Sequence, residues 1–429
     1  LDLFDCCLRL YWRRTFGARG EPGRHTGTSI PVDAGRVTPY QKRLRVRPYA
    51  LLVSVHNAEH ELDEFLEAMQ PFRDRLWMID DRSTDYTIAL IRQAGFRCVR
   101  GEQNRKKPGA IRTLLDALPP EVETVMVLDP DIVMLAPGAE QRTHLETVIF
   151  DFQQSEAAAL CPRVAIRQGG FLARLQAFEY CLSFSLGRGS LADYCVNSGV
   201  ALYRRAALAS ALERHTFSVY AEDLQTSLLL LGAGERGYYD GRLVMETIGK
   251  RRWRDWFSQR VGWYYGLIKV YIEGFDDVVR VSRRRLSAGY HFLLYTGVFA
   301  LVLHPFKLVS LVLVLLSLAN GLDDLAGLRW VPDWEAADPV YFLAAYGKCL
   351  LFVLIGLFAA VPREDRLHLL PATPMYFFYA FAQLVPVTIG YLNWFSLRCL
   401  GARVFRDHYQ DEAGLIRQHR NGIANGADT

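Results

Sequence analysis

Four groups of acidic and aromatic residues follow one another along the chain and offer the parts of a group-transfer reaction. Carboxylates on tight turns suit Mg²⁺ or Mn²⁺, a further carboxylate can take a proton, and Arg with Trp can receive a phosphate and a sugar ring. We expect an active site for a nucleotide-sugar and an acceptor hydroxyl at a membrane surface. The groups are Asp80-Asp81, Asp129-Pro130-Asp131, Glu222-Asp223 and Gln259-Arg260-Val261-Gly262-Trp263.

Asp129 and Asp131 are the predicted metal ligands. They flank Pro130 directly after the apolar run Glu123–Leu128. Two carboxylates on one turn can hold a divalent cation, which then bridges the two phosphates of a nucleotide-sugar. The competing interpretation is an ordinary turn, because Asp is common in turns.

Two other acidic pairs have distinct predicted roles. One carboxylate of Asp80-Asp81 can hydrogen-bond a base or ribose while the other sits near the metal, although acids here can also cap a helix. Asp223 is the candidate general base, with Glu222 beside it. The alternative for Glu222 and Asp223 is a pair of acids that complements the dipole at a helix N-terminus.

Gln259, Arg260 and Trp263 lie at helical spacing. The face of Trp263 can stack on a sugar, and Arg260 can neutralise the departing diphosphate. Aromatic and basic residues can also anchor a helix at a membrane interface. We prefer that anchoring role for Trp253 and Trp256.

Short apolar runs alternate with segments of helical spacing through the first half of the chain. This alternation predicts an α/β fold with a mixed, mostly parallel sheet and helices on both faces. Ligands bind such sheets at the carboxyl ends of the strands, where the first two acidic pairs stand. The expected strands are Tyr49–Val55, Leu76–Asp80, Arg97–Arg100 and Glu123–Leu128, and the expected helices are Glu61–Met69, Asp85–Ala94 and Lys107–Leu118.

The chain divides into segments of different composition. The predicted parts are an N-terminal interfacial or loop segment (1–47), a catalytic domain (48–249), amphipathic interface helices (250–289), a membrane region of two or three spans (290–400) and a cytoplasmic tail (401–429). The interface helix is expected over Lys250–Tyr271, with its apolar face in the membrane surface and a basic opposite face.

Three apolar segments form the predicted membrane region. Tyr290–Leu318 carries His304-Pro305, where we expect a kink. Val340–Val361 is long enough to span a bilayer. Arginines before the first segment and in the tail place both ends inside, so we favour a non-spanning path for Leu369–Leu397. The catalytic domain is then cytoplasmic, at an inner or plasma membrane.

Composition narrows the classes of function. The 429 residues are 51% hydrophobic with a net charge of +4, too small a charge to argue for nucleic acid as a partner. The eight cysteines show no zinc-ligand spacing and are expected to be reduced in a cytosol-facing protein. Dinucleotide, P-loop and Ser-nucleophile motifs are absent. The chain starts at Leu1, without a cleavable signal peptide, and is expected to come from a longer protein.

Taken together, the motifs resemble those of the inverting membrane glycosyltransferases of the cellulose, chitin and hyaluronan synthase family, over residues 48–270. The resemblance implies a GT-A fold. Two positions depart from the family pattern: Ala221 begins the acidic motif, and Gly262 stands where the family has Arg. The implied roles are donor binding for His56, Asn57, Asp81, Lys107 and Asp129, metal binding for Asp129 and Asp131, acceptor contact for Asn197, Ser198 and Gly199, proton abstraction for Asp223, and the interface-helix motif for Gln259, Arg260 and Trp263.

The resemblance implies transfer of sugar from a UDP-sugar to a growing polysaccharide, with export through the membrane segments. Two alternatives stay open. Gly262 and the few spans favour a non-processive enzyme that adds one sugar to a lipid, and an inactive nucleotide-sugar-binding scaffold of a secretion complex is the other. The expected partners are a UDP-sugar, a glycan or lipid-linked acceptor, membrane lipid and export-complex subunits.

Overall fold

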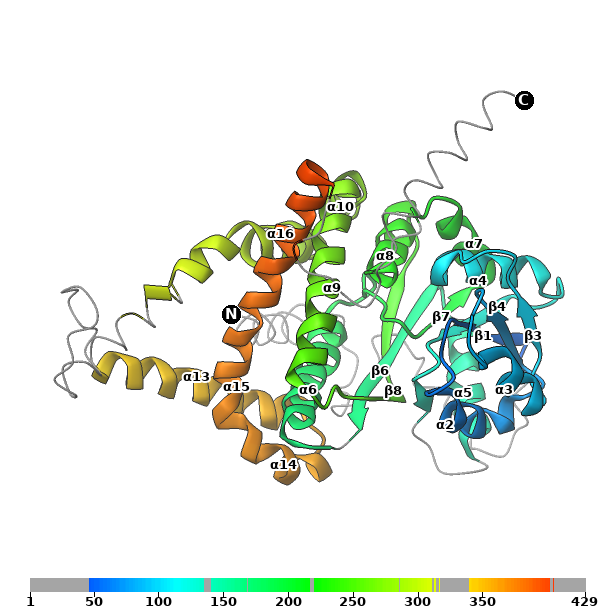
Figure 1. Ribbon diagram of the computed structural model, residues 1–429, viewed down its shortest axis with the longest axis horizontal. Helices are drawn as coiled ribbons and strands as arrows, with labels where there is room; N and C mark the ends of the chain where they lie inside the picture. The colour runs from blue at the N-terminus through cyan, green and yellow to red at the C-terminus, as the bar shows by residue number, and fades with distance from the viewer. Residues whose placement is uncertain are drawn as a thin grey trace.

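A mixed sheet carries the candidate site, and a layer of apolar helices stands beside it (Figure 1). The computed structural model describes residues 46–134, 140–167, 169–216, 220–284, 286–310 and 339–401, together with 312, 313, 316 and 404. The predicted segment 1–47 and the predicted tail 401–429 lie outside these residues except at 46, 47, 401 and 404. The strands are β1 Tyr49–Val55, β2 Leu76–Asp80, β3 Cys98–Arg100, β4 Thr124–Leu128, β5 Val133–Met134, β6 Ala159–Arg167, β7 Ala201–Arg204 and β8 Gly237–Ile248.

Within the described residues the strands form one eight-stranded sheet in the order β3-β2-β1-β4-β7-β6-β8-β5. The first four are parallel, with β1 paired to both β2 and β4. β7 runs antiparallel to β4 and β6, β6 and β8 are parallel, and β5 is antiparallel to β8. The predicted mixed, mostly parallel sheet is confirmed.

Helices cover both faces of the sheet, as predicted. β1 is apolar along nearly its whole length (YALLVSV) and buried on both sides, which is typical of a central strand between two helical layers. Leu51 and Val53 belong to the core beneath Phe65 of α2, whereas Leu52 packs with Leu114 of α4 on the other face. The helices are α2 Leu62–Ala68, α3 Thr87–Gln93, α4 Lys106–Ala117, α5 Glu140–Gln154, α6 Phe171–Cys181, α7 Arg205–Glu213 and α8 Glu222–Ala233, with short turns η2 Gln70–Phe72, η3 Leu182–Gly187 and η4 Arg188–Ser190.

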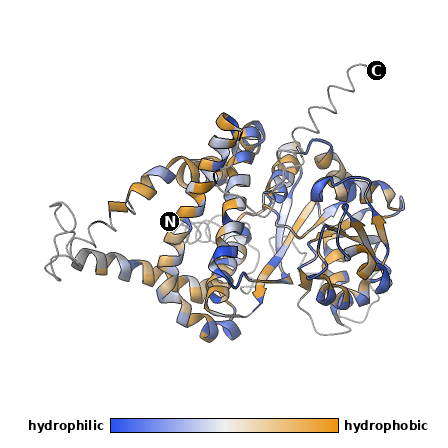
Figure 2. Cartoon of the chain, viewed as in Figure 1, coloured by the Kyte–Doolittle hydropathy of each residue, from blue (hydrophilic) through white to orange (hydrophobic). Residues whose placement is uncertain are grey.

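The second half of the chain is mostly helical. Figure 2 shows strongly hydrophobic helices on the left of the view, beside a domain whose hydrophobic strands are enclosed by more polar helices. The elements are α9 Trp253–Glu273, α10 Phe275–Ser282, α11 Leu286–Gly289, the π-helical η5 Tyr290–Val302, α13 Pro339–Ala360, α14 Arg363–Leu369, η6 Leu370–Ala372, α15 Thr373–Ala382 and α16 Leu384–Leu400.

The predicted interface helix forms, but its surroundings differ from the expectation. α9 lies against α16 (Figure 1), and Gly390 of α16 brings the two backbones together at Tyr264 and Tyr265. Arg260, which was expected to neutralise a departing diphosphate, is 1% exposed. An acid on α6 is its ion-pair partner.

Only part of the described chain has the length and composition of a membrane span. One helical segment of 38 residues, Arg363–Leu400, is long and apolar enough to cross a membrane; it contains α14, α15 and α16. Leu286–Val302 and His304–Ser310 are bent by 43° relative to each other, and they meet the same criteria only if the pair is counted as one span. The predicted kink at His304-Pro305 is confirmed. The 38-residue helix contains Leu369–Leu397, for which we favoured a non-spanning path, and that path stays a prediction.

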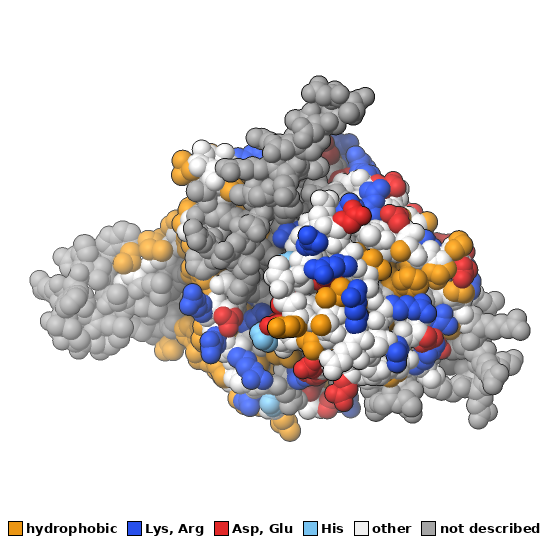
Figure 3. Space-filling view, turned by 45° about the vertical axis from the view of Figure 1, so that its right-hand side comes forward, with side chains coloured by type: hydrophobic (Ala, Val, Ile, Leu, Met, Phe, Trp, Pro, Cys, Tyr) orange, Lys and Arg blue, Asp and Glu red, His pale blue; other side chains and the backbone are white. Residues whose placement is uncertain are grey.

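The surface differs between the two halves in the same way. Figure 3 shows charged side chains of both signs interspersed over the sheet domain, and hydrophobic side chains at the side of the later helices. Exposed apolar residues of this kind suit contact with lipid or with another apolar surface. They include Leu351, Phe358, Leu392, Phe395 and Leu400.

Candidate active site

Lys107 is the centre of the candidate active site. It lies in the first turn of α4, and its ammonium group donates to Asp129 Oδ1 at the end of β4 and to the Gly199 carbonyl at 2.8 Å. Its Nζ is also 3.6 Å from Glu222 Oε1 at the start of α8. One cation therefore joins residues that are far apart in the sequence and that were each expected at the site.

The start of α8 brings both candidate catalytic acids to the same place. Ala221 precedes the helix in the left-handed conformation (φ 57°), and Gln225 N–H donates to its carbonyl. Glu222 and Asp223 then line a small cavity of about 30 Å³ together with Lys107. Ser198, Gly199 and Tyr203 line it as well. The cavity is too small for a nucleotide-sugar, so it is at most the innermost part of a larger site.

A hydrogen-bonded path ties the turn 197–199 to α8. Asn197 N–H donates to Ser227 Oγ at 2.9 Å, and that hydroxyl donates to the Asp223 carbonyl at 2.7 Å. Gly199 has no room for a side chain, because an added Cβ would meet the Asp129 carboxylate. The turn that sequence assigned to the acceptor therefore forms the wall that holds Lys107 and Asp129.

The pKa values of Glu222 and Asp223 are raised above their usual range. Burial raises the pKa of Glu222 to about 7; Lys107 opposes this, while Asp223 and Asp129 add to it. Burial also raises the pKa of Asp223 against the influence of Lys107. The pKa of Lys107 is raised, because Asp129 and Glu222 outweigh the effect of its burial. Glu222 therefore gains or loses a proton near neutral pH.

Asp129 and Asp131 are the residues of the site that could hold a divalent cation together with substrate phosphates. Neighbouring protein atoms desolvate the Asp131 carboxylate and, together with the charge of Asp129, raise its pKa. Part of the Asp131 side chain is still exposed to solvent. Asp131 also accepts from Thr247 Oγ1 at 3.0 Å. Among the described residues no three acids, His or Cys gather to hold a metal by themselves. Two carboxylates suffice for Mg²⁺, which takes its remaining ligands from substrate phosphates and water.

His56, Asn57 and Asp81 lie together at the carboxyl ends of β1 and β2. His56 Nδ1 is 3.0 Å from the Asp81 carbonyl, and Asn57 Oδ1 accepts from Thr84 N–H at 2.8 Å. Asp81 accepts from Arg105 N–H, and its burial raises the pKa of its carboxyl group. Both His56 and Asn57 are exposed, as residues that meet a ligand should be.

Asp80 has a different position from the one the sequence suggested. Its side chain is fully buried, and Oδ1 accepts from Ser83 N–H at 3.0 Å. This bond closes the turn after β2, so Asp80 shapes the loop that presents Asp81. Direct contact with a base or a metal is not available to Asp80 in this arrangement.

Gln259, Arg260 and Trp263 form a separate centre on α9. Arg260 Nη2 donates to Glu179 Oε2 at 2.6 Å, and its guanidinium lies 4.2 Å from the centre of the Trp263 ring. Trp263 is 39% exposed and Gln259 is half-buried. Across the described ranges, no hydrogen bond or ion pair joins this centre to the Lys107 cluster.

Three contributing residues were missed by sequence reasoning. Glu179 of α6 and Tyr379 of α15 meet at Arg260, and Tyr379 Oη donates to Glu179 Oε2 at 2.5 Å. Neither belongs to a motif, and only the folded chain brings them together. Asn104 Nδ2 lies 3.3 Å from the His56 ring. Its place in a polar loop after β3, at the same sheet edge, was a signal that could have been used.

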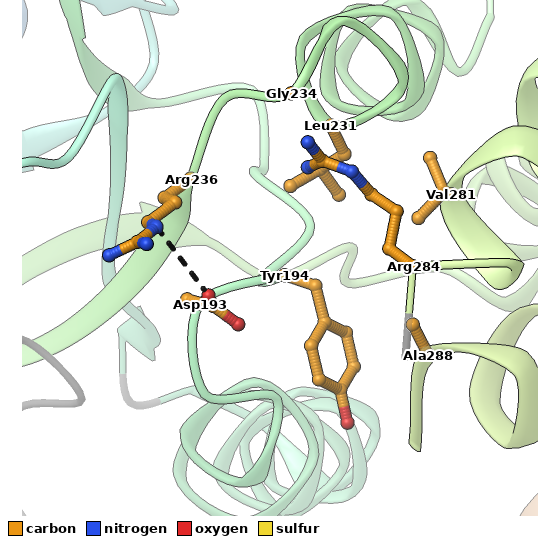
Figure 4. Close-up of a pocket in the computed structure, with 8 residues that line it drawn as sticks. All are labelled: Asp193, Tyr194, Leu231, Gly234, Arg236, Val281, Arg284 and Ala288. Carbon is orange, nitrogen blue, oxygen red and sulfur yellow. Dashed lines mark ion pairs between the residues drawn. The ribbon is translucent and has the colours of Figure 1, made fainter. Parts of the chain in front are cut away.

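A larger cavity of about 260 Å³ lies away from the predicted residues (Figure 4). It separates the end of α8 from the segment after α10. In Figure 4 the guanidinium of Arg284 extends toward Gly234, while that of Arg236 is directed to Asp193, at 3.8 Å. The two cations do not converge, and Arg284 Nη1 already donates to the Glu235 carbonyl. This cavity is therefore not a second candidate for the active site.

The sequence of the sheet domain matches a known family. Residues 50–209 match the family model described as glycosyl transferase family 2. This segment extends from β1 into α7 and contains Lys107, Asp129 and the turn 197–199. It is a family 2 glycosyltransferase domain, and the mixed sheet is of the GT-A type. No curated protein matches the chain.

Solved structures with a related arrangement are distant. A crystal structure of a mycobacterial protein aligns over 49% of this chain and 70% of its own, at 16% identity and a TM-score of 0.34. Glucosyl-3-phosphoglycerate synthase from Mycobacterium tuberculosis, in complex with Mn²⁺, UDP and glucosyl-3-phosphoglycerate, aligns over 43% of this chain and 64% of its own, at 20% identity and a TM-score of 0.28. In complex with phosphoglyceric acid, the same enzyme aligns over 49% and 75%, at 18% identity and a TM-score of 0.32. These TM-scores are too low to indicate a substrate.

Proposed function

We propose that this chain, whose residues 50–209 are a family 2 glycosyltransferase domain, is a membrane-bound inverting enzyme that transfers sugar from a UDP-sugar to the hydroxyl of a growing polysaccharide. The observation that carries the proposal is the convergence of Asp129, Glu222 and Gly199 on Lys107. It unites residues from the donor, acceptor and catalytic motifs around one cation.

Asp223 is the proposed general base. Its Oδ1 accepts from Leu224 N–H at 2.8 Å, which leaves the second oxygen for an acceptor hydroxyl. The base takes the hydroxyl proton, the acceptor oxygen bonds to the anomeric carbon, and the bond from that carbon to the diphosphate breaks with its electrons on the diphosphate. Attack and departure on opposite sides invert the anomeric centre. Glu222, whose pKa is about 7, can share the released proton.

Asp129 and Asp131 are the proposed ligands of a divalent cation. Such a cation neutralises charge on the departing diphosphate. Lys107 is placed to do part of the same work, because its Nζ is bonded to Asp129 and borders the cavity. His56, Asn57 and Asp81 are the proposed wall for the nucleoside. Two buried nitrogens of Arg260, Nε and Nη1, donate no hydrogen bond to any described residue. Oxygen atoms of a bound ligand would accept hydrogen bonds from them.

A non-processive enzyme with a lipid acceptor is the second candidate. Two observations favour it: Gly262 replaces the Arg of the family motif, and the described chain offers one candidate span, or two if the bent pair counts as one. A long polymer needs a path across the membrane, and few spans make that path harder to enclose. In both cases the enzyme is proposed to lie in an inner or plasma membrane with the catalytic domain in the cytoplasm.

A donor screen tests both proposals. Purified protein in detergent is given UDP- and GDP-sugars with Mg²⁺, Mn²⁺ or EDTA, and nucleotide release is measured. We expect release from at least one UDP-sugar with a metal and none with EDTA. Product length from radiolabelled donor then separates a polymer from a single addition. Nucleotide binding without release from any donor would favour the inactive scaffold and overturn the enzyme assignment.

A further inference from the structure

Tyr220 lies across two glycines of α9 at a distance that leaves no room for a larger residue. A Cβ at Gly262 would come within 2.8 Å of Tyr220 Oη and closer still to the ring carbons. A Cβ at Gly266 would come within 2.6 Å of Tyr220 Cβ, 2.7 Å of its carbonyl carbon and 2.8 Å of its oxygen. Carbon atoms in ordinary contact stay about 3.5–4.0 Å apart. The two glycines therefore form a seat for Tyr220, the ring over Gly262 and the backbone over Gly266.

The seated residue is the one directly before the catalytic turn. Tyr220 is 7% exposed, and Ala221 follows it with φ 57°, a value that is uncommon outside glycine. Glu222 and Asp223 come next and line the cavity with Lys107. A left-handed residue between an anchored side chain and a helix fixes where that helix starts. A shift of Tyr220 along α9 is thus transmitted to both carboxylates.

α16 also approaches the backbone of α9 closely. At Gly390 an added Cβ would lie 3.0 Å from Tyr265 N and 3.2 Å from the Tyr264 carbonyl carbon. Tyr264 Oη also donates to Gln383 Oε1 at 2.7 Å. α9 therefore packs closely against both the catalytic turn and a helix of the candidate membrane span.

We infer that Tyr220 is a positioning residue: its seat on Gly262 and Gly266 sets the location of Glu222 and Asp223 relative to Lys107 and Asp129. The inference rests on the proposed function for the identity of the catalytic acids. It also gives Gly262 a role of its own, because any side chain at 262 would displace the Tyr220 ring. Tyr220 itself touches neither donor nor acceptor in this role.

The two glycines make the inference testable, because different parts of Tyr220 oppose them. Gly262→Ala collides with the ring, so Tyr220→Ala should relieve the collision. Gly266→Ala collides with the backbone and Cβ, which Tyr220→Ala retains, so the same second change should give no relief. We expect Gly262→Ala and Gly266→Ala to lower kcat by about 10- to 100-fold while the KM and Kd for the donor change less than about threefold. Tyr220→Ala removes the ring from its seat and should by itself lower kcat. In the Tyr220→Ala background, Gly262→Ala should cost less than about a further twofold in kcat, whereas Gly266→Ala should still cause its full loss.

Gly347→Ala is the matched control. Gly347 is also a helical glycine, in α13, and a Cβ there meets no atom within 4 Å. It should leave kcat and the melting temperature unchanged. The inference is overturned if Gly262→Ala behaves like Gly347→Ala, if Tyr220→Ala alone leaves kcat unchanged, or if the Tyr220→Ala background removes the effect of both glycine changes or of neither.

A failure of the proposed function stays distinguishable from a failure of this inference. If the wild-type protein releases no nucleotide, the same set of variants is compared by melting temperature. The seat then predicts that Tyr220→Ala reduces the loss caused by Gly262→Ala but not the loss caused by Gly266→Ala. Additive losses at both glycines would reject the seat whatever the enzyme does.

Discussion

The cluster around Lys107 and the cluster around Arg260 differ in their balance of charge and of hydrogen-bonding groups. At Lys107 three carboxylates (Asp129, Glu222, Asp223) gather around one cation, and the pKa values of Glu222 and Asp223 are raised. At Arg260 the reverse holds: one acid, Glu179, pairs with a guanidinium that keeps two buried N–H groups without partners among the described residues. The first centre lacks positive charge, and the second lacks acceptor oxygens.

The difference teaches what each centre can do. Raised carboxylate pKa values suit proton transfer and cation binding, which need a group that changes charge easily. A buried Arg keeps its positive charge. It can hold neighbouring groups in place, or it can donate hydrogen bonds to the oxygens of a ligand.

The largest effect should come from removing the proposed base. Asp223→Asn should lower transfer by about 10³-fold or more, since the amide cannot accept the hydroxyl proton. Donor binding, measured by calorimetry, should remain within about threefold of wild type. Asp116→Asn, at an exposed position of α4, is the matched control. Transfer at the wild-type rate by Asp223→Asn would assign the base elsewhere, with Glu222→Gln the next variant to measure.

Breaking the Arg260 centre should chiefly cost stability. Arg260→Met leaves Glu179 partly buried without its cation, and loss of one partner of such a pair costs about 3–5 kcal/mol. We expect a lower melting temperature in detergent. Arg254→Met, at an exposed position in the same helix, should have little effect. If Arg260→Met melted normally but lost donor binding, Arg260 would be a ligand residue and the two centres would not divide their work as proposed.

Removing the cation of the first centre should weaken catalysis and shift its pH dependence. Lys107 lowers the pKa of Glu222 and Asp223. Lys107→Met should therefore reduce kcat at pH 7 by about 100-fold and move the rise of activity to higher pH. Lys107→Arg keeps the charge and should retain the position of that rise even if its rate is low. An unshifted pH profile in Lys107→Met would separate Lys107 from the acids.

The smallest predicted effect is the pH dependence of the wild-type enzyme. A carboxyl group with a pKa of about 7 is protonated below that pH, so kcat should rise about tenfold between pH 6 and pH 8. The stability contribution has the opposite sign: it is present below the ordinary pKa of 4.5 and is lost as the pH rises through about 7. Glu222→Gln should flatten both trends. A flat wild-type profile would mean that Glu222 is ionised throughout.

Sequence alone predicted the local elements well and the long-range contacts poorly. The strands at Tyr49–Val55 and Leu76–Asp80 were found with the same bounds, because continuous apolar runs between turns leave few other structures. Asp80 was misplaced, since an acid after a strand looks the same whether it binds a ligand or caps a turn. The pairing of Arg260 with Glu179 depends on how α6 packs on α9, which spacing along the chain does not reveal.

The contact at Gly390 would carry a movement of α16 to α9, and a bilayer could cause such a movement. A helix whose apolar length differs from the thickness of the hydrocarbon layer tilts to match it. If Arg363–Leu400 crosses the membrane, tilting its α16 segment also turns α9, since the two backbones touch at Gly390. The turnover rate should then vary with acyl-chain length in reconstituted vesicles, and an equal rate in thin and thick bilayers would show that the contact transmits no tilt.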